Sequence, residues 1–219
     1  ETTGSKTIFR VNVDKITKIW EPFSDRYEGT YKIQRNLYKS IYGNKVLFEE
    51  INHDLNLTYS YEWSSSNLFG FVRTSSLTNN SKKTVSVEFV DGIQNIVPYG
   101  VGSAIQNQSS NLVDAYKRSE LVKDSGLGIY ALSAIIVDKA EPSEALKANV
   151  VWSLGLNNPK YLLSSRQLKK FRNNRNIQEE LDVKAEKGAY FLNTRIELEP
   201  DTKRKWKIIA EVNKDHSTI

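Results

Sequence analysis

Hydrophobic and polar residues alternate along much of this chain, which is the period of a β-strand with one buried face. The clearest example is Leu55–Trp63, where hydrophobic residues occupy every second position of a nine-residue stretch. In Thr84–Phe89 the same pattern predicts that Val85, Val87 and Phe89 lie in the core. Turn-forming residues recur about every ten residues, as in β-sandwiches. The predicted fold is therefore mainly β, a large antiparallel β-sandwich (supersandwich).

Clusters of turn formers indicate where these strands end. The polar run 78–83 precedes the strand Thr84–Phe89, and Asp91-Gly92 follows it as a second turn signal, so we interpret residues 73–98 as a hairpin unit. A closing hairpin is expected from Gly188–Glu197 and Lys205–Val212, with its turn at residues 199–202. Both units would place sequence neighbours side by side in one sheet.

One or two short helices are expected on the connections between strands. Ser110-Asn111 can cap a helix that runs from Leu112 to Val122, and Ser164-Ser165 can cap another that ends near Arg172. Between them lie two continuously apolar stretches, 127–138 and 146–156, whose composition suggests strands buried on both faces.

The amino-acid composition excludes several kinds of site and a membrane-spanning helix. The 219 residues include no cysteine, which excludes disulfides, thiolate catalysis and cysteine-type zinc sites. No window holds the roughly 20 apolar residues that a membrane-spanning helix needs, so no membrane partner is expected. We read residues 1–219 as a single domain and as a fragment of a longer chain. No signal peptide is visible, and both a cytoplasmic and a periplasmic location stay open.

The net charge of +5 would first suggest nucleic acid as a partner. The one dense basic cluster, Arg166–Arg175, is followed at once by acidic residues and by no recognised nucleic-acid motif. We therefore interpret it as the solvated face of a helix and expect no nucleic-acid partner.

Few residues are arranged for catalysis. The two histidines, His53 and His216, are far apart in the sequence, and both are interpreted as structural or surface residues. The adjacent carboxylates Glu49-Glu50 and Glu179-Glu180 point to different sides of a strand or helix, which does not suit a shared acid–base site. We expect no catalytic residue, no metal and no cofactor in this chain.

Aromatic residues are the better candidates for a binding site, because the face of a Trp or Tyr ring suits the C–H face of a sugar. Trp63 and Tyr61 share one strand face, while Asn95 and Tyr99 lie in the segment after Asp91, where sugar contacts are expected. The alternative is that these rings belong to the core, as large aromatic groups usually do.

The order of several segments resembles a known family. Residues 69–73, 77–79 and 90–98, followed by 112–117, 140–146, 151–155 and 162–167, are similar to the N-terminal, galactose mutarotase-like β-supersandwich of cellobiose phosphorylase-like enzymes, once classed as glycosyltransferases. The resemblance implies a supporting domain without catalytic residues. It also implies a downstream (α/α)6 barrel as partner, an oligosaccharide substrate for the parent enzyme, and a role in homodimer formation.

Three functions stay open at this point. The first is a non-catalytic, carbohydrate-binding or supporting domain of a glycoside phosphorylase- or hydrolase-like enzyme. The second is a stand-alone glycan-binding module that uses the rings of Trp63 and Tyr61. The third is an epimerase or lyase that acts on sugars in its own concave sheet, and an epimerase would need His53 and His216 as a pair.

Overall fold

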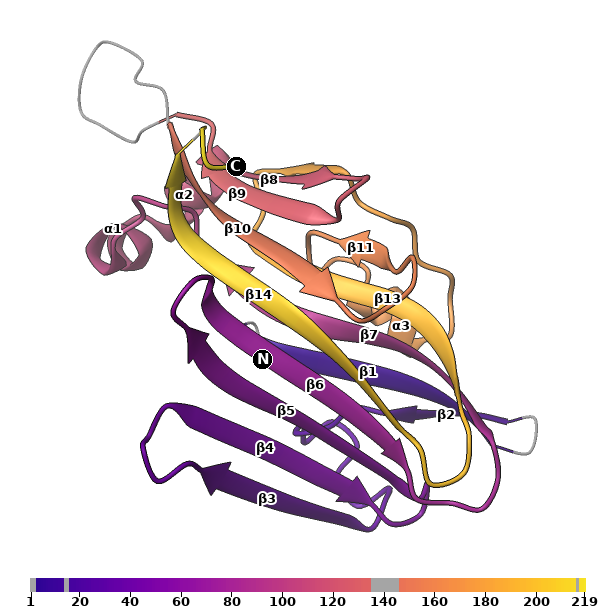
Figure 1. Ribbon diagram of the computed structural model, residues 1–219. Coiled ribbons are helices and arrows are strands. Elements are labelled where there is room, and N and C mark those ends of the chain that lie inside the picture. The colour runs from indigo at the N-terminus through magenta and orange to yellow at the C-terminus, as the bar shows by residue number, and fades with distance from the viewer. Residues whose placement is uncertain (1–2, 14–15, 135–145, 216) are drawn as a thin grey trace.

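The computed structural model describes residues 3–13, 16–134, 146–215 and 217–219 and shows a two-layered β-sandwich (Figure 1). Nearly all of its regular structure is β-strand, arranged in two antiparallel sheets, and the described residues include three short helices. The prediction of a mainly β sandwich is confirmed.

The larger sheet has nine strands in the order β12-β8-β9-β10-β14-β6-β5-β4-β3. Along the chain, their bounds are β3 Ile33–Lys39, β4 Lys45–Asn52, β5 Leu57–Ser66, β6 Gly70–Asn79, β8 Lys117–Val122, β9 Leu127–Leu132, β10 Lys147–Leu154, β12 Asp182–Lys184 and β14 Lys203–Asp215. The smaller sheet has five strands in the order β11-β13-β7-β1-β2. Their bounds are β1 Gly4–Val13, β2 Ile16–Trp20, β7 Val85–Ile96, β11 Lys160–Leu162 and β13 Gly188–Leu198.

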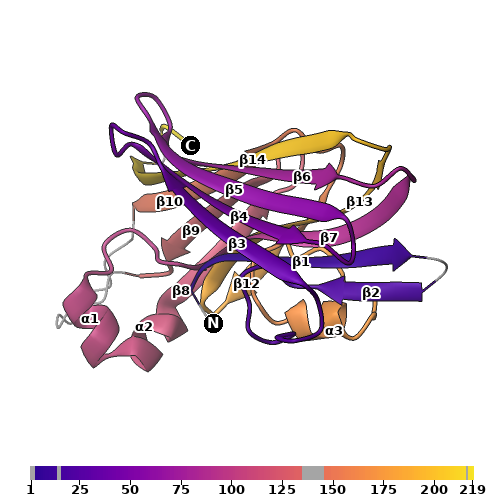
Figure 2. The ribbon, with the colours of Figure 1, turned by 90° about the horizontal axis from the view of Figure 1, so that it is seen from below.

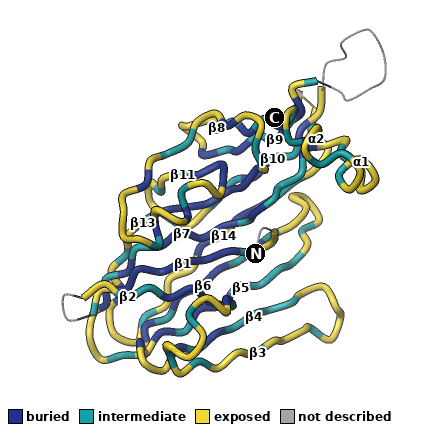
Figure 3. Tube along the Cα trace, turned by 180° about the vertical axis from the view of Figure 1, so that it is seen from behind, coloured by how far each residue is buried: buried dark blue, intermediate teal, exposed yellow. Residues whose placement is uncertain are grey.

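The main core lies between the two sheets, and Figure 3 shows long buried stretches in β1 and β7. It includes Val85, Val87 and Phe89, all buried as predicted, and the inward-facing Leu57 and Tyr59. A second cluster lies on the other face of the five-stranded sheet, where Leu168 and Phe171 of helix α3 (Leu168–Arg172) pack against it. Figure 2 shows α3 on the side of this sheet that faces away from the nine-stranded sheet. The five-stranded sheet is therefore covered on both faces.

The two expected hairpins are wrong, because the chain changes sheets at both turns. β6 pairs with β5 and β14, whereas β7 pairs with β1 and β13. Likewise β13 belongs to the five-stranded sheet and β14 to the nine-stranded sheet. The buried side chain of Asn79 joins the two corners: its Nδ2 lies 2.8 Å from the carbonyl oxygen of Lys83 and 3.0 Å from that of Leu198.

The expected turn at Asp91-Gly92 is also wrong, since both residues lie within β7. Gly92 serves close packing of strands instead. A Cβ atom there would lie 2.0 Å from the carbonyl oxygen of Tyr190 and 2.6 Å from Cδ1 of Phe191 on β13. Only glycine allows the two strands to approach this closely.

The predicted helix 112–122 is correct only in its first part. Helix α2 spans Ser110–Tyr116, and a further helix that was not predicted, α1, spans Ser103–Gln108. The remainder forms β8, because it pairs with β9 and β12. The predicted helix ending near Arg172 is confirmed as α3.

The two apolar stretches form β9 and β10. Burial alternates along β9, and in β10 only the neighbouring Val150 and Val151 are buried on both faces. Residues 135–145, which include the end of the first predicted strand, lie outside the described part of the chain. One face of each strand packs toward the five-stranded sheet, which is sufficient to explain their apolar composition.

Candidate functional site

The densest group of polar side chains lies inside the sandwich, around Asp91 of β7. Both Asp91 and Arg73 of β6 are fully buried, and their closest contact is 2.8 Å from Arg73 Nη1 to Asp91 Oδ2. Arg73 Nη2 lies 2.8 Å from Asp91 Oδ1, so the pairing is bidentate. Four further donors reach the carboxylate, from Thr7, Tyr59, Ser75 and Trp206.

Burial and charge act in opposite directions on this pair. Burial alone would raise the pKa of Asp91, but the charge and hydrogen bonds of Arg73 outweigh it and hold the pKa below its ordinary value. Burial raises the pKa of the Tyr59 hydroxyl far above its ordinary value. Asp91 is thus a carboxylate and Tyr59 a neutral phenol at neutral pH. Every acceptor position is occupied by protein, so the cluster joins the two sheets and is closed to substrate.

A polar hollow of about 390 Å³ lies between the segment 21–31 and the strands β3 and β4. Its buried carboxylates are already paired: Glu21 with Lys6 and Arg172, and Glu50 with Arg35 and the indole N–H of Trp20. Burial would raise the pKa of Glu21, but hydrogen bonds from Arg172 and Lys6 lower it. These carboxylates hold the 21–31 segment against the sheets.

A larger pocket of about 520 Å³ opens at the end of the sandwich where β7 ends and β6 begins; we call it the end pocket. Trp63 lines it together with Phe71 of β6 and Ile93 and Ile96 of β7. Val212 of β14 belongs to its rim, and the side chains of Phe71 and Val212 are 56% and 58% exposed. The pocket therefore offers an exposed apolar surface between the two sheets.

The polar residues of the end pocket are already used by the protein. Asn149 donates a hydrogen bond to the carbonyl oxygen of Val97 and accepts one from the backbone N–H of Asn213. Glu211 forms an ion pair of 2.9 Å with Lys214. A sugar is oriented by polar groups that it contacts directly. This pocket suits an apolar side chain better than a sugar ring.

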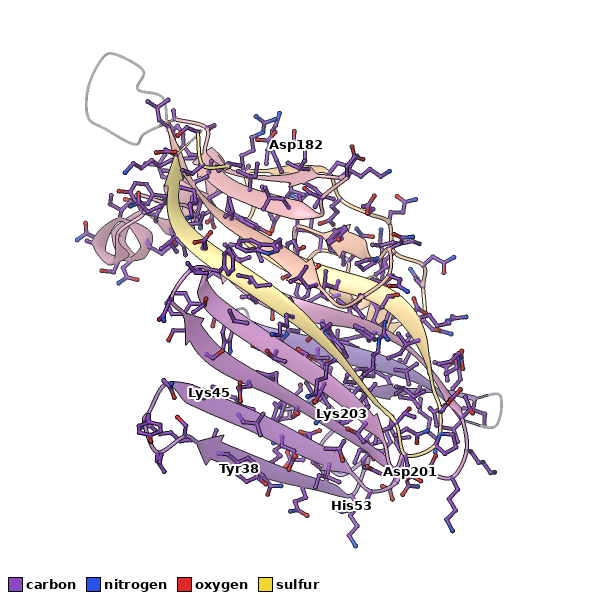
Figure 4. The ribbon with its side chains drawn as sticks, viewed as in Figure 1. Tyr38, Lys45, His53, Asp182, Asp201 and Lys203 are labelled. Atoms are coloured by element: carbon purple, nitrogen blue, oxygen red, sulfur yellow. The ribbon has the colours of Figure 1, made fainter. Side chains whose placement is uncertain are left out.

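A smaller, polar groove of about 240 Å³ lies on the outer face of the nine-stranded sheet. Ser60 and Ser76 face each other there, with their hydroxyl oxygens 2.8 Å apart, and the exposed Lys203 and Lys205 flank them. Lys203 is labelled on this sheet in Figure 4. The groove carries hydroxyl and ammonium groups but no aromatic side chain in its lining.

The four predicted sugar-binding residues have different surroundings. Trp63 lines the end pocket, whereas Tyr61 is half-buried and stacks on Phe48 with ring centroids 4.8 Å apart. Tyr99 is 40% exposed, beside Lys147.

Asn95 occupies a β-bulge in β7, since Ala189 pairs with Gln94 and Gly188 with Ile96. It has a left-handed backbone and a buried side-chain oxygen without a hydrogen-bond partner among the described residues. The structure thus does not present the two strand aromatics as an exposed platform.

Neither histidine can be assigned to a functional site in the part of the chain that the structure describes. His53 is exposed in the turn between β4 and β5 (Figure 4), and His216 lies outside the described residues. In the parts of the chain that the structure describes, no group of three or more His, Cys, Asp or Glu could hold a metal ion. None of the described helices is long and apolar enough to cross a lipid bilayer.

The sequence interpretation missed the Arg73–Asp91 cluster. The available signal was Arg73 itself, which shares strand parity with the hydrophobic Leu77 and so lies at a position expected to be buried. A charged residue at such a position requires a buried partner of opposite charge.

No family model matches this sequence, and no curated protein matches it. Its fold is similar to that of a polysaccharide lyase, with a TM-score of 0.50 and 16% identity over 97% of this chain. Weaker similarity links it to heparinase III (TM-score 0.42, 14% identity, 84% of this chain and 22% of that chain) and to a 4-α-glucanotransferase from Thermococcus litoralis (0.30, 10%, 96% and 27%). The chain spans about a quarter of the polysaccharide lyase, 26% of its length. The comparison thus identifies the sandwich as one also found within a much larger protein.

Proposed function

We propose that this chain is a non-catalytic β-sandwich domain of a larger carbohydrate-active enzyme. The observation that carries the proposal is the similarity of fold across 97% of the chain to a polysaccharide lyase of which the chain would make up 26%. The sequence resemblance to the supersandwich of cellobiose phosphorylase-like enzymes supports the same general function. The sandwich would form one wall of the substrate cleft.

The placement of the buried charged groups favours a domain that is structural rather than catalytic. The Arg73–Asp91 cluster has all its hydrogen-bonding positions filled within the core, so it stabilises the sandwich rather than acting on a substrate. Catalytic groups would then belong to another part of the parent enzyme.

The end pocket supports contact with such a part. Its lining is almost entirely apolar, and its polar residues are paired within the chain. An exposed apolar surface of this kind is typical of a contact between proteins or domains. We propose that apolar side chains of the parent enzyme's neighbouring domain fill it.

The experiment compares the complete gene product with the 219-residue chain on a panel of polysaccharides and oligosaccharides, with and without phosphate. We expect turnover only by the complete product. A sugar phosphate, a reducing sugar or an unsaturated product would identify phosphorolysis, hydrolysis or elimination respectively. Turnover by the 219-residue chain alone would reject the supporting role.

Contact through the end pocket is tested by Phe71→Asp and Val212→Asp in the complete product. Both side chains are largely exposed, so the sandwich should remain folded while activity or domain contact falls at least tenfold. Leu68→Asp is the matched control, because Leu68 is 76% exposed and lies outside the pocket lining. Equal effects of pocket and control substitutions would contradict a domain contact.

A second candidate function is glycan binding by the end pocket, and the specific observation in its favour is that Trp63 forms part of the wall. Tyr61, Asn95 and Tyr99 do not line this pocket, so sugar contacts by these three residues would form a separate part of the proposed site. Trp63→Ala should abolish saturable oligosaccharide binding without unfolding the chain. Trp152→Ala is the control, since Trp152 is also half-buried on the nine-stranded sheet but outside the pocket.

A further inference from the structure

The strand β3 forms a free edge of the nine-stranded sheet (Figure 1). Among the described strands it pairs only with β4, and most of its residues are exposed, as the yellow tube in Figure 3 shows. It contains no proline, and its register with β4 has no bulge. An exposed, regular edge strand is a template for pairing with another strand.

The other free edges are shorter. The opposite edge of the same sheet is β12, with three residues, and the edges of the smaller sheet are β11 with three and β2 with five. β3 has seven residues and continues into the turn 40–44. Apolar side chains are exposed along this edge: Leu37 of β3 is 66% exposed, and Ile41 and Tyr42 of the turn are 92% and 85% exposed. This edge therefore combines unpaired backbone with apolar surface.

The register with β4 determines which backbone groups face outward. The bonds from His53 N to Lys32 O and from Ser40 N to Lys45 O identify residues 32 and 40 as bonded toward the neighbouring strand. Bonded and non-bonded residues alternate in an antiparallel pair. Ile33, Arg35, Leu37 and Lys39 therefore direct their N–H and C=O groups to the free edge.

We infer that β3 pairs antiparallel with β3 of a second copy of this chain, around a twofold axis at Asn36. This register opposes Arg35 to Leu37 and Ile33 to Lys39 of the second copy. Every outward-facing residue then exchanges hydrogen bonds, and the two nine-stranded sheets become continuous. A self-complementary contact of this kind is the usual basis of a twofold dimer.

Repulsion between like charges disfavours the two nearest alternative registers. A twofold axis at Arg35 would place two guanidinium groups opposite each other, and an axis at Leu37 would oppose Arg35 to Lys39. Like charges directly opposite in a sheet are destabilising. The axis at Asn36 avoids both, because it opposes Arg35 to Leu37 and Lys39 to Ile33 of the second copy. This inference goes beyond the proposed function and does not depend on it.

The oligomeric state is tested first, by light scattering and sedimentation over a range of concentrations. We expect a mass twice the 25.0 kDa of one chain. Leu37→Pro removes an N–H that faces the free edge and none that bonds to β4, so the folded chain should become monomeric. Leu37→Ala is the matched control, because it removes the side chain but keeps the N–H and should remain dimeric.

The register is tested by cysteine cross-linking, since the chain has no cysteine of its own. Asn36 would face its own copy as a non-hydrogen-bonded pair with Cα atoms about 4.5 Å apart, within the range of a disulfide. Asn36→Cys should therefore form a covalent dimer under mild oxidation.

Tyr38→Cys is the control, because residues 38 of the two copies would lie about 14 Å apart along the strands. Both native side chains contact the same oxygen of Glu49, so the two substitutions remove comparable interactions. A monomeric wild-type chain, a dimer that survives Leu37→Pro, or cross-linking at residue 38 equal to that at residue 36 would each overturn the inference.

Discussion

The buried carboxylate of Asp91 gives the sharpest prediction about stability. Asp91→Asn keeps the shape of the side chain but replaces one acceptor oxygen with an NH2 group. If the NH2 group took the Oδ1 position, Arg73 Nη2 and the hydroxyls of Thr7 and Tyr59 would lose their acceptor. On the Oδ2 side, the indole N–H of Trp206 is among the donors and cannot turn away, whereas hydroxyl groups can. We therefore expect the NH2 to take the Oδ1 side.

The magnitude follows from the charge that remains. Arg73 is fully buried, and Asp91 is its bidentate partner, so the variant leaves a guanidinium without a compensating charge. Breaking a buried pair in this way costs about 3–5 kcal/mol. A domain has a free energy of unfolding of about 5–15 kcal/mol, so the variant should fold but lose a large part of its stability.

Urea unfolding followed by circular dichroism measures this loss. Asp201→Asn is the matched control, because Asp201 is exposed in the turn between β13 and β14 and should change stability by no more than about 0.5 kcal/mol. The double variant Arg73→Met/Asp91→Leu should lose much less than the sum of its two single variants, since it removes both charges. A cost of Asp91→Asn below about 1 kcal/mol, or additive single effects, would refute the reasoning.

Acid provides an independent check of the same residue. The pKa of Asp91 is held below its ordinary value of 3.8, so its stabilising effect is complete above that pH and decreases as the pH falls below it. The difference in unfolding free energy between wild type and Asp91→Asn should therefore be constant near neutral pH and narrow below pH 3.8. A constant difference through this acid range would contradict the lowered pKa.

Two further substitutions test the close packing of the sandwich. Gly92→Ala should destabilise the chain by several kcal/mol or prevent folding, because its Cβ would overlap the backbone of β13. Gly102→Ala is the control: a Cβ at that position would have no atom within 4 Å, so its effect in thermal unfolding should be nearly neutral. Asn79→Ala should cost about 2–4 kcal/mol in urea unfolding, because carbonyl groups at both sheet-changing corners lose the buried Nδ2 group that donates to them. Asn80→Ala, at an exposed neighbouring position, should cost under about 1 kcal/mol; equal losses at both positions would argue against this account of the corners.

Local sequence patterns predicted which segments form strands and which of their residues face the core. Alternation identified the strands and placed Val85, Val87 and Phe89 in the core, because the period of a strand reports which face is buried. It did not identify the sheet to which each strand belongs. A turn that reverses the chain within one sheet and a turn that crosses between sheets have the same local composition, so both hairpins were wrong.

The errors at Asp91-Gly92 and at residues 117–122 have the same physical origin. Asp and Gly are typical turn residues, but here each serves a distant contact: Asp91 with Arg73, and Gly92 with β13. Similarly, β8 is held by its neighbours β9 and β12, which override the helical pattern of the sequence. Of the predicted sugar-binding residues, Trp63 does line a pocket. The spacing of residues in the sequence could not predict that the polar residues of this pocket are paired within the chain, or that Tyr61 is half-buried against Phe48.

The central claim is that this sandwich supports carbohydrate chemistry carried out by another part of a larger enzyme. Turnover of polysaccharides and oligosaccharides by the complete gene product and by the 219-residue chain, measured side by side, tests it most directly. The account predicts product only from the complete gene product, and none from the isolated chain. Product formation by the isolated chain, or an active complete protein that contains no further domain, would contradict it.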